Sequence, residues 1–475
     1  MPGSAATRDR NREWSFLGGR TLLGVVALIL LVLTSLGSLP SATAADLPAA
    51  ATADAPTNAP PAAAARFDAD AATAAYLATM TAASRARSDA YFEGGYWLIL
   101  WDFVIGLLLA WALLGLRLSA GMRDFAARLT RLSWAQTALY AIQYFILTAL
   151  VTLPWAAYEG YFREHQYGMS NQSLSDWLGD QAKGLVITLI FGTIAVVAIY
   201  AVIRRLPKTW WLWGSLVAIA MVIFQVAIGP TYLEPVFNRF YPLAESPLKQ
   251  RILSLARANA IPVDQVYEFD ASKQTTKMSA HVSGLAGSAQ ISLNDNLMNR
   301  ASPEEVEAVL GHEMGHYVLN HIYKSVVEIG VLVVIGFAFA SWGFGRVLRV
   351  GARWGVRDVA DLAGLPLLIA LFTVYGFVLT PVFNTITRTQ EAEADAFGLN
   401  AVRQPDGFAQ AALHLSEYRK MRPGPVEETI FFDHPSGWNR IHRAMVWKAE
   451  NISTADIAAY DALHHPPGTA RTGAP

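Results

Sequence analysis

Long apolar runs alternate with polar segments along this chain of 475 residues. Each run is long enough to cross the roughly 30 Å hydrocarbon core of a bilayer as a helix. The pattern therefore predicts a mainly α-helical, polytopic membrane protein, in which a polar region separates four spans from two more. The six runs cover residues 96–116, 135–158, 184–203, 209–228, 325–344 and 362–383.

The N-terminus allows two interpretations. Residues 1–40 contain four arginines and then an apolar stretch at 21–39, which fits either a cleaved signal peptide or a first transmembrane helix. The retained helix is slightly favoured and gives about seven spans in total. Residues 41–90 are rich in Ala and Pro and predict a linker, and residues 463–475 predict a disordered tail.

The polar segments predict an extramembrane domain made of two parts. The first part, residues 229–324, follows the four-helix membrane region 91–228 and contains short apolar stretches at 266–269, 278–283 and 289–293. Turn residues separate these stretches, which indicates a small β-sheet. The second part, residues 387–462, follows the two spans in 325–386 and has the pattern of amphipathic helices.

A strong helix start stands at the end of the first part. Ser302 occupies an N-cap position, Pro303 follows at the first helical position, and Glu305 completes the pattern of a capping box. These signals predict a helix over residues 302–321.

The predicted helix contains the sequence HEMGH. His312 and His316 are four residues apart, so both imidazoles project from one helix face and can bind a single ion. Glu313 lies about 100° further round the helix, where it can act on a water molecule at that ion. Since the chain has no cysteine, only His, Asp and Glu are left as ligands, and the motif predicts a Zn²⁺ site.

A catalytic zinc needs a third protein ligand, and the segment after the last span offers it. Glu391 and Asp395 are four residues apart on one helix face, and the alanines at 392, 394 and 396 allow a second helix to approach closely. We assign Glu391 to zinc and expect Asp395 to orient a ligand histidine or to pair with a cation. Glu393 is the rival ligand, although it lies about 200° round the helix from Glu391.

Further along the chain, His434 and Arg440 are six residues apart in the segment DHPSGWNR. A histidine beside the scissile carbonyl can stabilise the oxyanion that forms during hydrolysis. Without a family comparison, the segment favours an ordinary surface loop histidine. We interpret His281, His321 and His414 as structural or solvent-facing.

Charge excludes some partners and suggests an orientation. The formal net charge is −1, and the basic clusters lie beside apolar runs, so nothing indicates a nucleic-acid partner. Fifteen Lys and Arg fall in residues 1–20, 117–131, 204–208 and 346–357, whereas five fall in the alternate segments 41–95 and 159–183. The positive-inside rule then places the catalytic domain outside the cytoplasm, for a protein of the bacterial inner or plasma membrane.

Together these segments resemble the membrane-integral zinc metalloproteases that include the type I CAAX prenyl proteases and their bacterial relatives. The resemblance implies Glu391 as the third ligand, Glu313 as general base, and His434 with Arg440 at the active site. It also implies helices that enclose a chamber in the membrane, with the zinc at its wall. The matching features are His312 to His316, Arg388 with Glu391 and Asp395, His434-Pro435 with Arg440, and residues 235–243.

The chain departs from this family at one motif. The family usually has Asn-Ala on the strand that flanks the substrate, whereas this chain has Ser279 and Ala280. The predicted extracytoplasmic site also differs from that of the eukaryotic prenyl proteases, which cut on the cytosolic side.

The expected function is zinc-dependent endopeptidase activity on protein or peptide substrates in the lipid bilayer. One alternative is a quality-control protease for membrane proteins without a CAAX preference. The other is a transporter or scaffold with a vestigial metal site, but the chain has no internal repeat and few ionisable residues within its spans.

Overall fold

The computed structural model describes residues 67–284, 289–351, 353–453, 456–457 and 459–460. All of them belong to the second of two compact units, which comprises Ala64–Pro475. The apolar stretch 21–39 and the predicted tail 463–475 lie outside the described residues.

Two helices lie where the sequence predicts the end of a linker. α2 (Ala69–Ala78) is capped by Asp68, whose side chain accepts a hydrogen bond from Ala71 N–H, and α3 (Ala82–Gly115) is capped in the same way by Thr81. The C-terminal part of the predicted linker 41–90 is therefore helical, because capping residues precede each alanine-rich segment.

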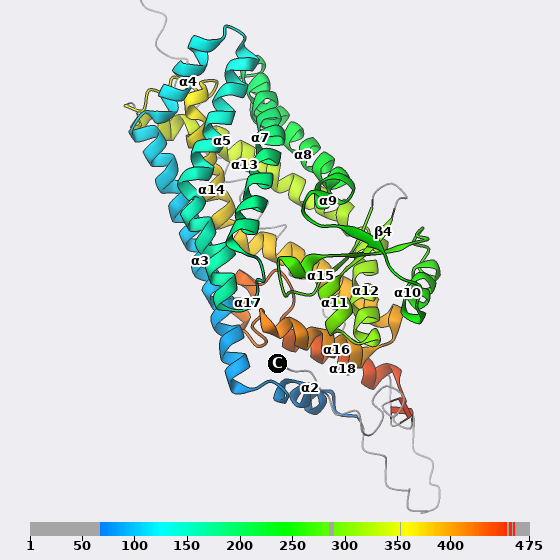
Figure 1. The fold of residues 1–475 in the computed structure, drawn as a ribbon. Helices are drawn as coiled ribbons and strands as arrows, with labels where there is room; N and C mark the ends of the chain where they lie inside the picture. The colour runs from blue at the N-terminus through cyan, green and yellow to red at the C-terminus, as the bar shows by residue number, and fades with distance from the viewer. Residues whose placement is uncertain (1–66, 285–288, 352, 454–455, 458, 461–475) are drawn as a thin grey trace, which may run out of the picture. The chain divides into compact units, whose positions relative to one another are not determined.

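The remaining helices of the membrane region follow in order (Figure 1). They are α4 (Leu118–Leu129), α5 (Ser133–Ala157), α7 (Leu174–Arg205) and α8 (Trp210–Ile228). α5 continues through the π-helical η1 (Tyr158–Arg163) into α6 (Glu164–Gln166), and α8 continues through η2 (Gly229–Leu233) into α9 (Glu234–Phe237).

The described helices confirm the six apolar runs as candidate spans. Five are long and apolar enough to cross a membrane: Ala82–Gly115, Ser133–Gln166, Leu174–Arg205, Trp210–Phe237 and His321–Val350. The sixth is a pair bent by 56°, in which η4 (Leu362–Gly364) and α14 (Leu365–Val378) precede α15 (Thr380–Val402). In the five single spans, only 11% to 22% of the apolar window is buried within the protein, so most of their surface is available to lipid.

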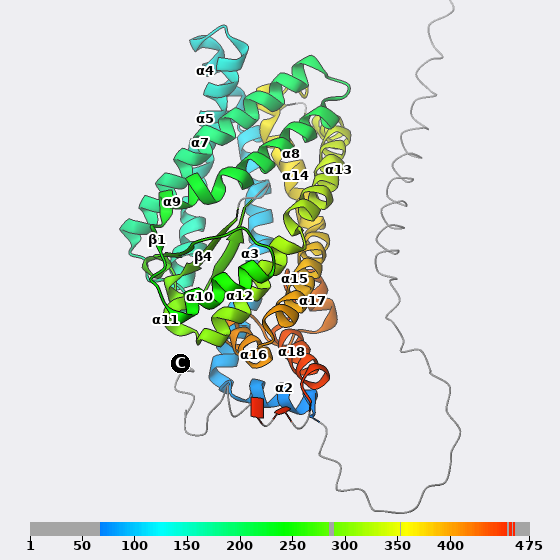
Figure 2. The same cartoon turned by 90° about the vertical axis from the view of Figure 1, so that its right-hand side faces the viewer.

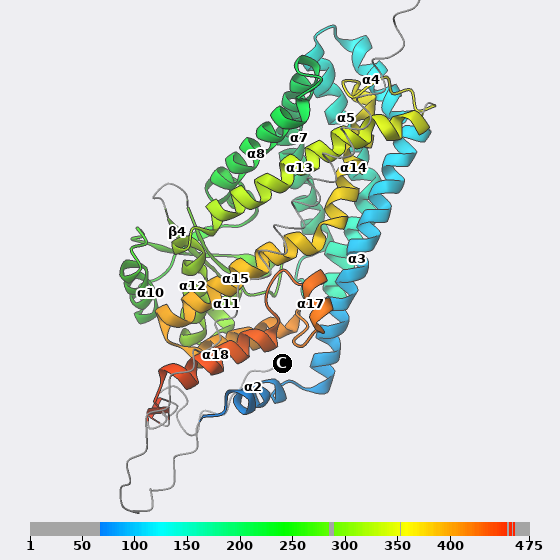
Figure 3. The ribbon, with the colours of Figure 1, turned by 180° about the vertical axis from the view of Figure 1, so that it is seen from behind.

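The span α13 (His321–Val350) packs against both α8 and α14, and Figure 3 shows it between them. Buried aromatic side chains fill this contact, including Trp210, Phe337 and Phe344. The spans on either side of the polar region therefore share one hydrophobic core.

A four-stranded sheet with the order β1-β2-β4-β3 lies beside α10 (Pro247–Ala258) and α12 (Pro303–Val318) (Figure 2). β2 (Val266–Phe269), β3 (Ala280–Ser283) and β4 (Gln290–Asn294) confirm the three predicted strands, whereas the three-residue β1 (Phe240–Pro242) was not predicted. β2 and β4 are parallel and the other pairs are antiparallel. In the part of the chain that the structure describes, β3 is thus an edge strand with one side free of a strand partner.

α12 (Pro303–Val318) carries the HEMGH sequence and is shorter than predicted. It starts after Ser302, as expected, but ends at Val318, because Asn320 adopts a positive φ of 57° and α13 begins at His321. The short α11 (Asp295–Arg300) precedes it. Only the serine half of the capping box forms: Ser302 Oγ accepts a hydrogen bond from Glu305 N–H, while the Glu305 carboxylate lies beside His414.

α12 crosses α15 at very short range. A Cβ added to Gly315 would lie 3.0 Å from Ala394 Cα, and Ala394 itself is fully buried. This confirms that small residues let the two helices approach. α16 (Pro405–His414), η5 (Leu415–Glu417), α17 (Pro425–Phe431) and α18 (Gly437–Asn451) complete the predicted helical C-terminal part.

Candidate metal centre

Three potential ligands converge where α12 crosses α15. His312 Nε2 lies 3.1 Å from Glu391 Oε2, and His316 Nε2 lies 3.3 Å from Glu391 Oε1. The two histidine Nε2 atoms are 3.1 Å apart, and all three ligand atoms lie within 4.8 Å of one another. The close helix crossing therefore gathers the three side chains that the sequence assigned to the metal.

The donor set fits a catalytic metal ion. Glu391 Oε2 is buried and accepts no hydrogen bond from the described residues, so a cation would satisfy it. Two histidines and one glutamate form a ligand set that catalytic zinc uses in hydrolases, with one coordination position left for water or substrate.

A buried carboxylate holds the far side of His312. His312 Nδ1 lies 2.8 Å from Asp395 Oδ1, which fixes Nδ1 as the protonated nitrogen and leaves Nε2 free for a metal. Asp395 is fully buried. Its carboxylate accepts hydrogen bonds from Arg440 Nη2 at 2.5 Å and from Arg443 Nη1 at 3.3 Å. Asp395 thus occupies both of its predicted positions, beside a ligand histidine and beside a cation.

His316 is held by a second histidine. His316 Nδ1 lies 2.9 Å from Nδ1 of the buried His321, and His321 Nε2 lies 3.0 Å from Glu393 Oε2. Lys324 Nζ donates to the same Glu393 oxygen at 2.5 Å. Every polar atom is satisfied if His316 donates from Nδ1 and His321 donates from Nε2 to the carboxylate.

This arrangement corrects two sequence interpretations. Glu393 is not placed as a rival to Glu391, because its carboxylate contacts His321 and Lys324. His321 is more than a structural histidine, because it contacts His316 directly.

His434 reaches the same centre from the loop before α18. Its Nε2 lies 3.3 Å from Glu391 Oε2, and its Nδ1 lies 2.8 Å from Asp433 Oδ1. Burial alone would raise the pKa of Asp433, but the hydrogen bond with His434 lowers it. Arg388, one turn before Glu391, donates to the backbone carbonyls of Glu428 and Phe432 and so attaches this loop to α15.

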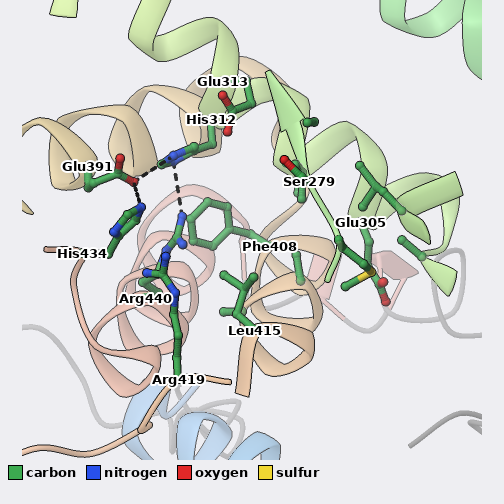
Figure 4. A pocket seen from close by; sticks show the side chains of 18 of the residues that line it. Ser279, Glu305, His312, Glu313, Glu391, Phe408, Leu415, Arg419, His434 and Arg440 are labelled. Carbon is green, nitrogen blue, oxygen red and sulfur yellow. Dashed lines mark hydrogen bonds and ion pairs between the residues drawn. The ribbon is translucent and has the colours of Figure 1, made fainter. Parts of the chain in front are cut away.

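A cavity of about 170 Å³ opens beside two of the candidate ligands, His312 and Glu391 (Figure 4). Glu313 lines it together with His312, Glu391, His434 and Arg440, so five of the candidate catalytic and ligand side chains share one space. The edge of the sheet contributes Met278, Ser279 and Ala280 to the wall.

Burial and charge set the protonation of this site. Burial raises the pKa of Glu313, which brings its carboxylate closer to the range of a general base at neutral pH. Burial alone would lower the pKa of His312, but the nearby carboxylates of Asp395 and Glu391 raise it to about 9. Burial alone would likewise lower the pKa of Arg440, but the charge of Asp395 raises it.

Comparison with known proteins also indicates a metallopeptidase. A model described as "Peptidase family M48" matches residues 242–448, and one described as "CAAX prenyl protease N-terminal, five membrane helices" matches residues 69–239. The chain is 31% identical over 351 residues to "Uncharacterized metalloprotease YhfN" of Bacillus subtilis, covering 72% of this chain and 82% of the relative.

Relatives with lower sequence identity also match this chain. "CAAX prenyl protease 1" of Saccharomyces cerevisiae is 28% identical over 311 residues, covering 61% of this chain and 68% of the relative. The crystal structure of S. mikatae Ste24p superposes with a TM-score of 0.66 at 21% sequence identity, covering 77% of this chain and 89% of that one, which shows a shared fold. With its multiple spans and its His312, His316 and Glu391 centre, this chain belongs to peptidase family M48 and is an integral membrane metalloprotease.

Proposed function

We propose that this protein is a zinc-dependent endopeptidase, in which His312, His316 and Glu391 hold the metal. The observation that carries the proposal is the convergence of these three donors beside a cavity that His312, Glu391 and Glu313 line. When bound there, zinc supplies Lewis-acid chemistry, polarising the scissile carbonyl and lowering the pKa of water.

The surrounding side chains perform the proton transfers. Glu313, whose pKa burial raises, accepts a proton from the attacking water and passes it to the leaving amine. His434, with a proton on Nε2, donates to the oxyanion from a position 3.3 Å from the ligand Glu391. Arg440 acts through Asp395, which orients His312.

The substrate peptide pairs with the sheet edge. Among the described residues β3 has no strand on its outer side, and Met278, Ser279 and Ala280 at its start line the cavity. An extended peptide added there as a further strand would pass directly along the metal ligands.

We propose protein or peptide substrates in the membrane, without assuming a prenyl group. The yeast relative is named "CAAX prenyl protease 1". The hydrolysis assay should therefore compare peptides that end in a CAAX sequence with peptides that lack it. Broad cleavage of unfolded proteins would instead favour a quality-control protease.

The catalytic domain lies outside the cytoplasm in this proposal. Arg117 Nε donates to the Arg353 carbonyl at 2.8 Å, so the arginine-rich segments around α4 and after α13 lie at the same end of the spans. Figure 1 shows α4 at the opposite end from α12 and α15. A reporter fused after Arg131 should be cytoplasmic, and an extracytoplasmic signal would reverse the orientation.

The test is peptide hydrolysis by the purified, detergent-solubilised protein. Glu313→Gln should lower kcat about 10²- to 10⁴-fold while zinc stays bound, because the base is lost and the ligands remain. A chelator should abolish activity, and added zinc should restore it. Activity retained in Glu313→Gln, or in metal-free protein, would contradict the proposal.

A further inference from the structure

The cavity beside the metal continues well beyond the catalytic side chains. One face of α12 forms its wall through Glu305, Ala308, Val309, His312 and Glu313, positions that recur at helical spacing. The facing wall comes from α16 and η5 through Phe408, Ala412 and Leu415. The result is a slot with apolar sides that starts at the metal ligands.

A carboxylate closes the far end of this slot. In Figure 4, Glu305 lies on the side opposite His434, Arg419 and Arg440, with Phe408 and Leu415 between them. The side chain of Glu305 is only 7% exposed, and it is not used as a helix cap. His414 Nδ1 lies 3.1 Å from Glu305 Oε2, and this buried oxygen accepts no hydrogen bond from the described residues.

We propose that this slot binds a substrate side chain next to the scissile bond, and that Glu305 selects a basic residue with a long apolar stem, lysine or arginine. This inference rests on the proposed peptidase function and names the substrate class of the same site. The apolar walls contact the methylenes, and the carboxylate receives the terminal cation.

The length of the slot matches such a side chain. Glu305 precedes His312 by seven residues, which is roughly 10 Å along the helix axis. An extended lysine reaches roughly 8 Å from the adjacent carbonyl carbon, and an ionic hydrogen bond adds about 2.8 Å. Leucine reaches only roughly 4 Å and would stop short of the carboxylate at the far end of the slot.

The test compares paired peptides that differ at one position beside the scissile bond. Lysine and norleucine have nearly the same stem, so their ratio of kcat/KM reports the terminal cation alone. On the zinc-loaded, full-length protein, the lysine peptide should be cleaved at least about tenfold faster at one of the two flanking positions.

Variants assign that preference to Glu305. In Glu305→Gln the ratio should fall to near one, whereas the neighbouring control Glu304→Gln should keep the wild-type ratio. Zinc content and the thermal melting temperature show that each variant is folded. His414→Gln leaves the Glu305 carboxylate in place and should preserve the preference for lysine. This variant can be measured even if Glu305→Gln does not fold.

Two outcomes would overturn the inference: equal cleavage of both peptides by the wild type, or a lysine preference that Glu305→Gln leaves intact. Either result requires that peptides be cleaved, so both are distinct from failure of the proposed function, in which no peptide is hydrolysed.

Discussion

His316, the second histidine of the HEMGH sequence, shares a 2.9 Å hydrogen bond between Nδ1 atoms with His321, the first residue of the next helix. The two ligand histidines are therefore supported differently. A carboxylate contacts His312 directly, whereas a histidine stands between His316 and its carboxylate, Glu393.

Removing His321 should weaken metal binding. His321→Ala leaves His316 Nδ1 without its acceptor, and loss of such a partner typically costs about 10- to 100-fold in metal affinity. Titration against a chromophoric chelator measures this. His321→Asn should recover part of the affinity, because its amide can accept from His316 and donate to Glu393.

His442→Ala is the matched control, since His442 pairs with the exposed Asp70 away from the metal centre. Unchanged zinc affinity in His321→Ala would show that the contact does not position His316.

His434 should affect turnover more than metal binding. His434→Ala removes the proposed oxyanion donor, and loss of one such donor typically lowers kcat about 10²- to 10³-fold. Zinc stoichiometry should stay at the wild-type value, because the three ligands remain. A variant that loses zinc together with activity would instead identify His434 as a ligand.

Metal affinity should depend on pH in a defined direction. The metal-free site holds a proton on His312 up to a pKa of about 9, and a metal ion must displace that proton. The apparent zinc Kd should therefore fall about tenfold for each pH unit between about 6 and 8. A flat profile across this range would contradict the protonation that the Asp395 and Glu391 contacts impose.

The crossing of α12 and α15 should not tolerate a residue larger than glycine at position 315. A Cβ at Gly315 would lie 3.0 Å from Ala394 Cα and 3.1 Å from its carbonyl oxygen, and backbone atoms cannot rotate away. Gly315→Ala should lower the free energy of unfolding by about 1 to 3 kcal/mol and weaken zinc binding, because α15 carries Glu391.

Gly376→Ala provides the comparison, since an added Cβ meets no atom within 4 Å there. Thermal melting of both variants, with and without zinc, separates the packing effect from metal loss. Equal melting temperatures for the two variants would show that the helices can separate without cost.

The local features of the site were predictable from the sequence. Ser302 and Pro303 mark the helix start, and the spacing of His312 and His316 sets both on one face whatever the remaining fold. Glu391 and Asp395 could be proposed because a zinc centre needs a third ligand and the segment carries paired carboxylates. Within α12 and α15, the geometry of a single helix was enough to place the side chains, whereas His434 and Arg440 could be placed at the cavity only through the family resemblance.

The misinterpreted residues depend on contacts between elements. His321 follows Asn320, whose positive φ turns the chain and returns the imidazole to His316, a change of direction that no periodic pattern records. Glu305 has the sequence of a cap, but its side chain lies beside His414, 109 positions later in the chain. The short β1 was missed because its three residues carry too little pattern.

The metal ligands are separated by a membrane hairpin. His312 and His316 precede α13, Glu391 follows α14, and both α13 and α14 are part of candidate spans. During synthesis, the ribosome completes the HEMGH helix long before Glu391 can join it. The nascent chain therefore carries only two of the three candidate ligands until both of these membrane segments have been synthesised.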